Sequence, residues 1–423
     1  MPFAVRKERK VFCKKNMLSK KSYQRGLLFT MILFLFLCCS CSVKKREDTD
    51  TLNYQYEYSH SSAGNIAKKD GYYYTNCNGF MQVSSQEDLN FVPLCANPDC
   101  KHDSDSCSAR KIWGGCPVFA YNEGLYILNS EYDEQKDISS DKLMKISLDN
   151  FTYTAVATIE ENAEEGGMCP DAFLHRGSLY YIDESIESDH LTVKAYRLNL
   201  QGNKKPEILL EVSAAYCGMK MFAYEDKVYF LVMSCEMKEA EEAVEAEDWK
   251  QIYGAAESSI YSYQTDEGKL EQITLPKDIF VNQFCADEKF LYYIDVKTLK
   301  THKLNLREGT DSVLFSIEDR GLVSELMCNE NYLFVWHCVD PFGSSDAPYT
   351  VEVYDREGFL VKEIELPPIS REYIVGGMPM GADEKYMLLY SRAENVIWVY
   401  DMEQIGSEEG QWEAVPLVSI EEG

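Results

Sequence analysis

The residues best suited to chemistry are gathered in one short segment of the chain. Cys95, Cys100, His102 and Cys107 fall within thirteen residues, in the spacing C-x4-C-x-H-x4-C. Three thiolates and one imidazole form a complete tetrahedral ligand set for Zn²⁺. We therefore predict a zinc site at these four residues. It would be structural rather than catalytic, because four protein ligands leave no open position for a water molecule.

Two other states of these thiols fit the same sequence. Outside the cytoplasm, two of the cysteines could form a disulfide, with Cys77 or Cys116 as further partners. In an anoxic setting the thiols could stay reduced. The ligand types favour zinc, whereas secretion favours oxidation, so the sequence leaves all three states open.

No other pattern predicts catalysis. The chain has no G-x-S-x-G nucleophile elbow, no H-E-x-x-H zinc motif and no Gly-rich phosphate loop. Acidic residues are too abundant for a carboxylate pair to be informative. We therefore name no catalytic residue and predict that the chain is not an enzyme. The remaining histidines are scattered, and we expect them to be ordinary surface or turn residues: His60, His175, His190, His302 and His337.

The fold that must position the cluster is indicated by a Tyr-rich phrase that recurs about every fifty residues. A polar turn precedes most copies, and two further strands follow, so each unit predicts a four-stranded sheet. Such sheets cannot bury their own faces and stack around an axis. We predict an all-β fold, a β-propeller of seven four-stranded blades, with six to eight as the range. The seven copies are centred on Tyr73, Tyr126, Tyr180, Tyr229, Tyr292, Phe334 and Leu388.

The repeat assigns residues 67–423 to the propeller. Glu236–Glu257 lengthens the fourth unit, and because this segment is rich in Ala and Glu and contains no Pro, we predict a helical insertion. Trp412–Ile420 is the predicted outer strand of the last blade. Residues 42–66 form a polar tether, in which Tyr54–Tyr58 could add a strand that helps to close the ring.

The first 41 residues are a targeting segment rather than part of the fold. A basic stretch precedes an uncharged apolar run over residues 26–41, which is short for a membrane span. The run resembles a bacterial lipoprotein signal peptide, which would make Cys41 the lipid-attachment residue, although Cys38 stands where that family usually has Leu. The alternative is a signal-anchor helix. Met17 is a second candidate start.

Charge is distributed unevenly along the chain. The net charge is −28, but residues 1–25 hold nine basic and one acidic side chain. The rest carries 33 basic and 69 acidic side chains, a net charge of −36. Such a surface repels phosphate backbones, so we expect no nucleic-acid partner.

Two phrases carry a family resemblance. Tyr180-Tyr181-Ile182-Asp183 and Tyr292-Tyr293-Ile294-Asp295 resemble the YWTD motif of receptor-type propellers, although that family has six shorter repeats. The chain is more similar to Tyr-rich β-propeller lipoproteins of Gram-positive anaerobic bacteria, whose function is unassigned. The resemblance implies a fold and a place at the cell surface, not an activity.

These features predict a monomeric β-propeller lipoprotein, anchored to the cell membrane at its extracytoplasmic face. We expect it to act as a binding module for a glycan, a peptide or an envelope protein. The alternative is a propeller enzyme, a lyase or hydrolase acting on cell-wall or dietary polysaccharide. The sequence does not specify the ligand.

Overall fold

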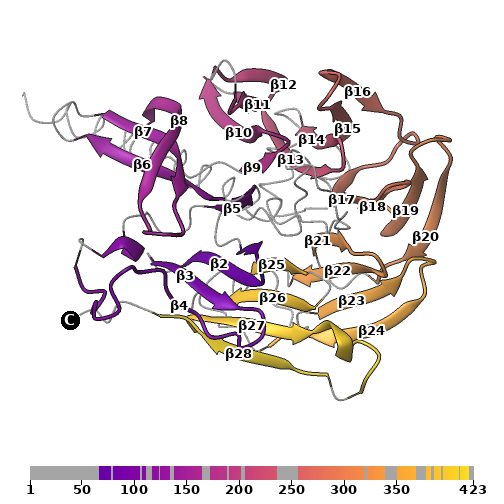
Figure 1. The fold of residues 1–423 in the computed structure, drawn as a ribbon. Coiled ribbons are helices and arrows are strands. Elements are labelled where there is room, and N and C mark those ends of the chain that lie inside the picture. Colours follow the sequence, from indigo (N-terminus) through magenta and orange to yellow (C-terminus); the bar gives the residue numbers. More distant parts are fainter. Residues whose placement is uncertain are drawn as a thin grey trace, which may run out of the picture.

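The protein is a seven-bladed β-propeller, as the repeat predicts. A computed structural model describes residues 66–77, 80–104, 107–110, 117–122, 124–133, 138–163, 172–187, 190–201, 205–235, 256–318, 322–338, 350–367, 378–382, 385–391, 394–408 and 410–418. These residues form seven four-stranded antiparallel sheets, each made of four consecutive strands. The sheets stand around a ring, with the first strand of each nearest the centre and the fourth on the periphery (Figure 1).

Blade 1 comprises β1 (Ile66–Lys69), β2 (Tyr72–Cys77), β3 (Phe80–Ser85) and β4 (Val92–Pro93). Blade 2 comprises β5 (Val118–Tyr121), β6 (Gly124–Asp133), β7 (Ile138–Ile146) and β8 (Tyr153–Ala163). Blade 3 comprises β9 (Ala172–His175), β10 (Ser178–Glu187), β11 (His190–Asn199) and β12 (Glu207–Ala214). Blade 4 comprises β13 (Tyr216–Tyr224), β14 (Lys227–Cys235), β15 (Glu257–Gln264) and β16 (Lys269–Ile273). Blade 5 comprises β17 (Val281–Ala286), β18 (Phe290–Asp295), β19 (Lys300–Asn305) and β20 (Asp311–Ser316).

Blade 6 comprises β21 (Leu322–Cys328), β22 (Tyr332–Cys338), β23 (Thr350–Asp355) and β24 (Leu360–Glu365). Blade 7 comprises β25 (Met378–Ala382), β26 (Tyr386–Ser391), β27 (Val396–Asp401) and β28 (Trp412–Pro416). Two 3₁₀ turns, η1 (Ser108–Arg110) and η2 (Met402–Gln404), are the only helical elements of the described residues. Within that part of the chain, no helix has the length and apolar character needed to cross a membrane.

Tight hairpins start the Tyr-rich strands, which are the second strand of every blade. In blade 3, Ser178 pairs with His175, so that Arg176 and Gly177 form a two-residue loop. Both loop residues have positive φ, 45° and 76°. A loop with positive φ at both positions matches the right-handed twist of the strands it joins. The polar turns of the repeat are therefore what sets the register of the first two strands.

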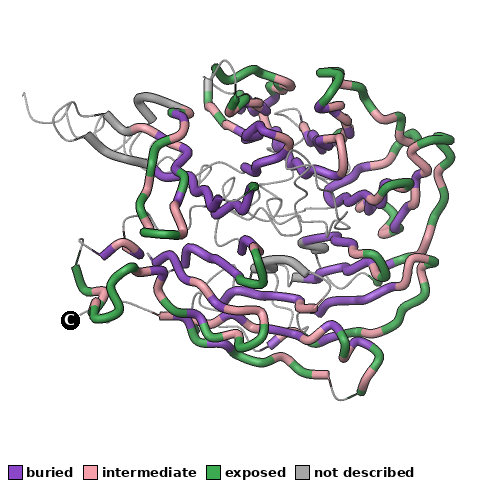
Figure 2. Tube along the Cα trace, in the orientation of Figure 1, coloured by how far each residue is buried: buried purple, intermediate pink, exposed green. Residues whose placement is uncertain are grey.

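The tyrosines of the repeat fill the spaces between blades. All seven centres of the repeat are buried, from Tyr73 in blade 1 to Leu388 in blade 7. In blade 4 the Tyr229 ring stacks on the Phe222 ring, with 5.0 Å between the ring centroids. The Phe222 ring in turn contacts the Phe284 ring of blade 5, with 4.7 Å between the centroids. Each such ring buries about 150–250 Å². Figure 2 shows burial concentrated on the strands near the axis and exposure at the rim.

Blade 1 and blade 7 close the ring without exchanging a strand in the described part of the chain. A shared apolar cluster joins the two blades, with Tyr73 on one side and Leu388 on the other. Gln82 adds a polar clasp, because its amide accepts from Val418 N at 3.0 Å and donates to Val418 O at 3.3 Å. Lys385 Nζ also donates to the Gln86 carbonyl oxygen at 2.9 Å.

Several predictions fall outside the described residues. They concern the signal segment with Cys41, the Tyr54–Tyr58 strand and residues 236–255 of the insertion. At the boundaries, β1 begins at Ile66, and Glu257 opens β15. The predicted last strand, Trp412–Ile420, is present as β28, which ends at Pro416.

Candidate metal centre

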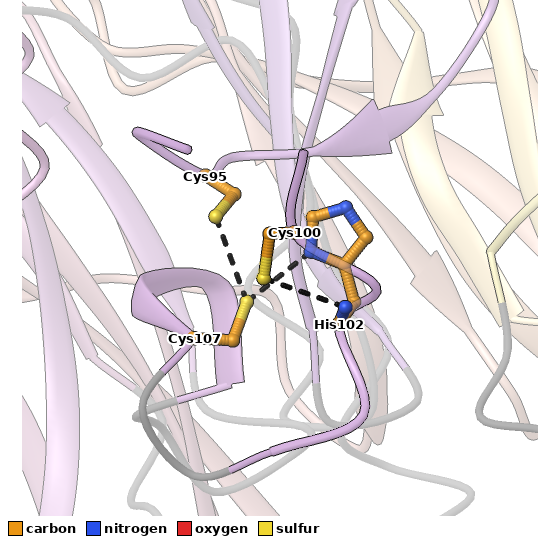
Figure 3. A group of neighbouring side chains, drawn as sticks. All are labelled: Cys95, Cys100, His102 and Cys107. Carbon is orange, nitrogen blue, oxygen red and sulfur yellow. Dashed lines mark hydrogen bonds between the residues drawn. The ribbon is translucent and has the colours of Figure 1, made fainter. Parts of the chain in front are cut away.

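The four predicted ligands come together in the connection between blades 1 and 2. This segment leaves the outer strand β4 and returns to the inner strand β5 of the next blade. The Sγ atoms of Cys95, Cys100 and Cys107 and a ring nitrogen of His102 all lie within 4.8 Å of one another. Figure 3 shows the four side chains pointing toward a common centre.

The spacing of the ligand atoms fits a tetrahedral zinc ion. Bonds of about 2.3 Å to sulfur and about 2.0–2.1 Å to nitrogen would put two sulfurs about 3.8 Å apart, and a sulfur and a nitrogen about 3.6 Å apart. The Sγ atoms of Cys95 and Cys107 are separated by 3.7 Å, and His102 Nδ1 lies 3.2 Å from Cys107 Sγ. These two separations are close to the tetrahedral values, and the whole set, which spans at most 4.8 Å, would contract around a bound ion.

Local turns bring the first three ligands together. Asn97 forms an Asx turn, in which its Oδ1 accepts from Asp99 N at 3.0 Å and its carbonyl oxygen accepts from Cys100 N at 3.1 Å. The turn folds Cys100 back toward Cys95. His102 has a φ of 58°, a left-handed conformation uncommon for residues other than glycine. Non-glycine residues in this region are frequent at functional sites.

The fourth ligand is held by a separate turn. Cys107 N donates to the Ser104 carbonyl oxygen at 3.0 Å, and the Cys107 carbonyl oxygen accepts from Arg110 N at 3.2 Å, which starts η1. The buried Cys107 thiol is thereby fixed at the bottom of the cluster, whereas Cys95, Cys100 and His102 are half-buried. The loop can thus supply all four ligands without any contribution from another blade.

Neighbouring side chains fix this loop to two blades. The Phe80 ring of blade 1 packs against the cysteines and meets the His102 ring edge-on at 6.4 Å. On the other side, Tyr153 OH of blade 2 donates to the Ser108 carbonyl oxygen at 3.0 Å. Ser108 Oγ also accepts from Ala96 N at 3.3 Å. The cluster therefore links the first two blades.

The thiols differ in acidity. Burial, together with hydrogen bonds to Cys95 and Cys100, raises the pKa of Cys107 to about 11, against a hydrogen bond with the Ala109 backbone that acts to lower it. Burial also acts to raise the pKa of Cys95, but hydrogen bonds from the Asn97 backbone, Ser108 and the two other thiols outweigh it and lower that pKa. Cys95 is thus more readily ionised than Cys107. A bound dication would favour the thiolate at all three positions.

The described cysteines are all free thiols. The 3.7 Å between the sulfurs of Cys95 and Cys107 is far beyond the 2.05 Å or so of a disulfide bond. Cys77, one further disulfide candidate, is buried in blade 1, and its burial raises the thiol pKa to about 12. Cys116 lies outside the described residues.

The prediction for three of the histidines was wrong, because His175, His302 and His337 are buried on strands. His302 Nδ1 lies 2.8 Å from Asp311 Oδ2, and its ring stacks on Tyr293. Two of these histidines face a carboxylate from the next strand of the same blade, because Glu352 Oε2 likewise lies 3.3 Å from His337 Nε2. The side chains of His302 and His337 are themselves buried.

Sequence reasoning missed the residues that support the metal ligands. The Asn97-Pro98-Asp99 stretch carries a recognisable turn signal. Phe80 and Tyr153 carry none, because they reach the loop from separate strands of two blades. Tyr121 of β5 and Trp336 of β22, two large aromatic residues, are buried in the core and are not exposed for binding.

Comparisons with known proteins supply no assignment. No protein-family model and no curated protein matches the sequence. Among solved structures, Hsv2 of Kluyvelomyces marxianus matches with a TM-score of 0.45 and 8% identity. The match covers 84% of this chain and 98% of the Hsv2 chain. The tricorn protease has a TM-score of 0.47 and 10% identity over 84% of this chain, but over only 35% of its own. An acylaminoacyl peptidase has a TM-score of 0.45 and 10% identity, and the match covers 86% of this chain and 53% of the peptidase chain. Similarities this low carry no argument about ligand or reaction.

Proposed function

We propose that this protein is an extracytoplasmic, lipid-anchored β-propeller that acts as a binding module, with a structural zinc ion in the connection between blades 1 and 2. One observation carries the zinc site: four ligand atoms of suitable type lie within 4.8 Å of one another. Three thiolates and one imidazole select zinc over the hard cations calcium and magnesium, which take oxygen ligands.

A structural role follows from the position of the ion. In the described part of residues 94–110, one 3₁₀ turn is the only regular structure, and order otherwise depends on short turns and side-chain contacts. A zinc ion would cross-link four points of this loop and hold it against Phe80 and Tyr153. The four protein ligands would complete the coordination, so the ion would have no free position for a substrate.

The binding role is supported by the scaffold. Seven blades form a rigid frame, and loops on rigid frames commonly carry recognition. The acidic charge outside the targeting segment favours a partner with basic groups. A glycan, a peptide and an envelope protein are the candidate ligands. In this proposal the lipid on Cys41 confines the propeller to the membrane surface.

Metal content tests the zinc site. Full-length protein purified without oxygen should contain one zinc ion per chain by mass spectrometry, and Cys100→Ser should lose most of it. Cys285→Ser is the matched control, because Cys285 is a buried cysteine of blade 5 outside the cluster. Wild-type protein without zinc, or equal zinc in all three proteins, would contradict the site.

Two further measurements test the anchor and the binding role. The N-terminal peptide from cells should begin at an acylated Cys41, and a peptide that continues through residues 26–41 would contradict the lipoprotein assignment. A screen of the protein against glycans, peptides and envelope proteins should yield binding without product. Turnover of a polysaccharide would instead favour the enzyme alternative.

A further inference from the structure

We propose that the outer rim of blades 5 and 6 binds an extended, basic protein segment with apolar side chains. The rim patch is defined by Val313 of β20 and by Phe359, Leu360 and Val361 at the start of β24. The inference rests on the proposed binding role and names the surface and the partner class. The two neighbouring strands run along the exposed periphery of the ring (Figures 1 and 2).

The patch stands out by its apolar exposure. Phe359 is 71% exposed, Leu360 53%, Val361 42% and Val313 50%. Half of the large hydrophobic side chains that are exposed in the described part of the chain lie here. Scattered single exposed hydrophobics are normal, whereas a cluster of them indicates an interaction site.

Irregular strand pairing explains why consecutive side chains point outward. In blade 6 the register shifts so that Val353 pairs with Lys362 and Tyr354 with Leu360, which leaves Val361 outside the ladder. The corresponding shift in blade 5 leaves Leu314 outside its ladder. Such bulges interrupt the inward and outward alternation of a strand. The apolar run is therefore a product of the backbone rather than of a misplaced core strand.

The two parts of the patch form one surface. The turn before β24 packs on β20 so closely that a Cβ at Gly358 would lie 2.8 Å from the Leu314 carbonyl oxygen. Lys303 Nζ of blade 5 donates to the Arg356 carbonyl oxygen at 3.1 Å. Arg356 also forms an ion pair with Asp287 and lies over the Tyr292 ring. The turn is thus fixed to blade 5, and the patch is preorganised.

The lysine of β24 and the aspartate of β20 are engaged elsewhere. Lysine on an edge strand normally discourages pairing. Lys362 of β24 instead turns toward blade 7, where its Nζ donates to Tyr400 OH and the Gln404 carbonyl oxygen. Asp311 of β20 is bonded to Tyr293 and His302. By contrast, the outer strands of blades 1 and 7 contain a proline.

The charge around the patch selects the partner. Glu357, Glu363 and Glu365 are exposed beside it, with Lys303 Nζ 3.8 Å from Glu357, and Lys362 is turned away. An acidic rim repels a second copy of this chain and an anionic lipid surface. A segment with basic side chains between apolar ones would place charges opposite the glutamates and apolar groups on the patch. β24 would also offer it a free strand edge.

A defined peptide tests the inference on the full chain. The probe is a fluorescent ten-residue peptide of alternating valine and lysine, with a valine–glutamate peptide as its counterpart. Binding is measured by fluorescence anisotropy up to millimolar protein. We expect the lysine peptide to bind and the glutamate peptide not to bind. The double variant Phe359→Ser/Leu360→Ser should weaken binding at least tenfold, with an unchanged circular dichroism spectrum.

The matched control is Ile186→Ser, because Ile186 is 77% exposed on blade 3, away from the patch. It should bind as the wild type does. No binding of the lysine peptide, or equal binding by the double variant, would overturn the inference and leave the wider binding role standing. Patch-dependent binding to vesicles of phosphatidylcholine and phosphatidylglycerol, or a patch-dependent dimer in sedimentation, would also overturn it, in favour of those partners.

Discussion

The Gln82 clasp makes a sharp prediction about how the ring closes. Gln82 is fully buried in blade 1, and its side-chain amide pairs with both backbone groups of Val418, which follows blade 7. The substitution Gln82→Met keeps a side chain of similar length and volume but removes both hydrogen bonds to Val418, together with a longer one of 3.5 Å to the Cys77 carbonyl oxygen. Two lost hydrogen bonds cost about 1 kcal/mol each, and the partly buried peptide groups left unpaired add roughly 1 kcal/mol. We expect a loss of about 2–3 kcal/mol in the free energy of unfolding.

Denaturant unfolding of the full chain measures this loss, and hydrogen exchange should locate it at the contact between blades 1 and 7. Gln272→Met is the matched control, because Gln272 donates to Ser259 Oγ at an exposed site of blade 4. We expect that substitution to cost less than about 0.5 kcal/mol. Equal losses in the two variants, or unchanged hydrogen exchange at Val418 in Gln82→Met, would show that these hydrogen bonds do not hold the ring closed.

Three further predictions concern packing, backbone and metal. Tyr229→Ala should cost about 3–5 kcal/mol in unfolding free energy, because it empties a packed site between blades, whereas Tyr72→Ala, at a half-exposed position, should cost less than about 1 kcal/mol. Gly358→Ala should lower the melting temperature more than Gly309→Ala. Both glycines have positive φ, but only a Cβ at position 358 would press against Leu314. Calorimetry that gives the reverse order of melting temperatures would contradict this packing. A zinc chelator should lower the melting temperature of the wild type, since zinc at a hundredfold excess over its Kd contributes about 2.7 kcal/mol, and should leave Cys100→Ser unchanged.

The fold could be predicted because each blade is a local unit. Hairpin turns such as Arg176-Gly177 and the tyrosines that follow them repeat in every unit, so period and spacing identify the strands without long-range information. Ring closure could not be predicted in this way. Gln82 and Val418 are 336 residues apart, and nothing in either local sequence indicates the other.

The grouping of the Cys/His cluster could be predicted for the same reason, since all four residues lie in one segment of thirteen, whereas metal binding itself stays a prediction. Their supporting residues, Phe80 and Tyr153, belong to strands on either side of the loop and become visible only in three dimensions. The buried histidines show the limit most clearly. His302 stands nine residues from Asp311, and only the pairing of β19 with β20 turns this separation into a contact.

The most direct test of the proposed zinc-held propeller is X-ray absorption spectroscopy at the zinc edge, on full-length protein purified without oxygen. We predict three sulfur ligands at about 2.3 Å from the zinc ion and one nitrogen ligand at about 2.0 Å, from Cys95, Cys100, Cys107 and His102. In Cys100→Ser the sulfur shell should shrink or the zinc should be lost. A zinc-free protein, or a zinc ion bound only by oxygen and nitrogen, would contradict the account.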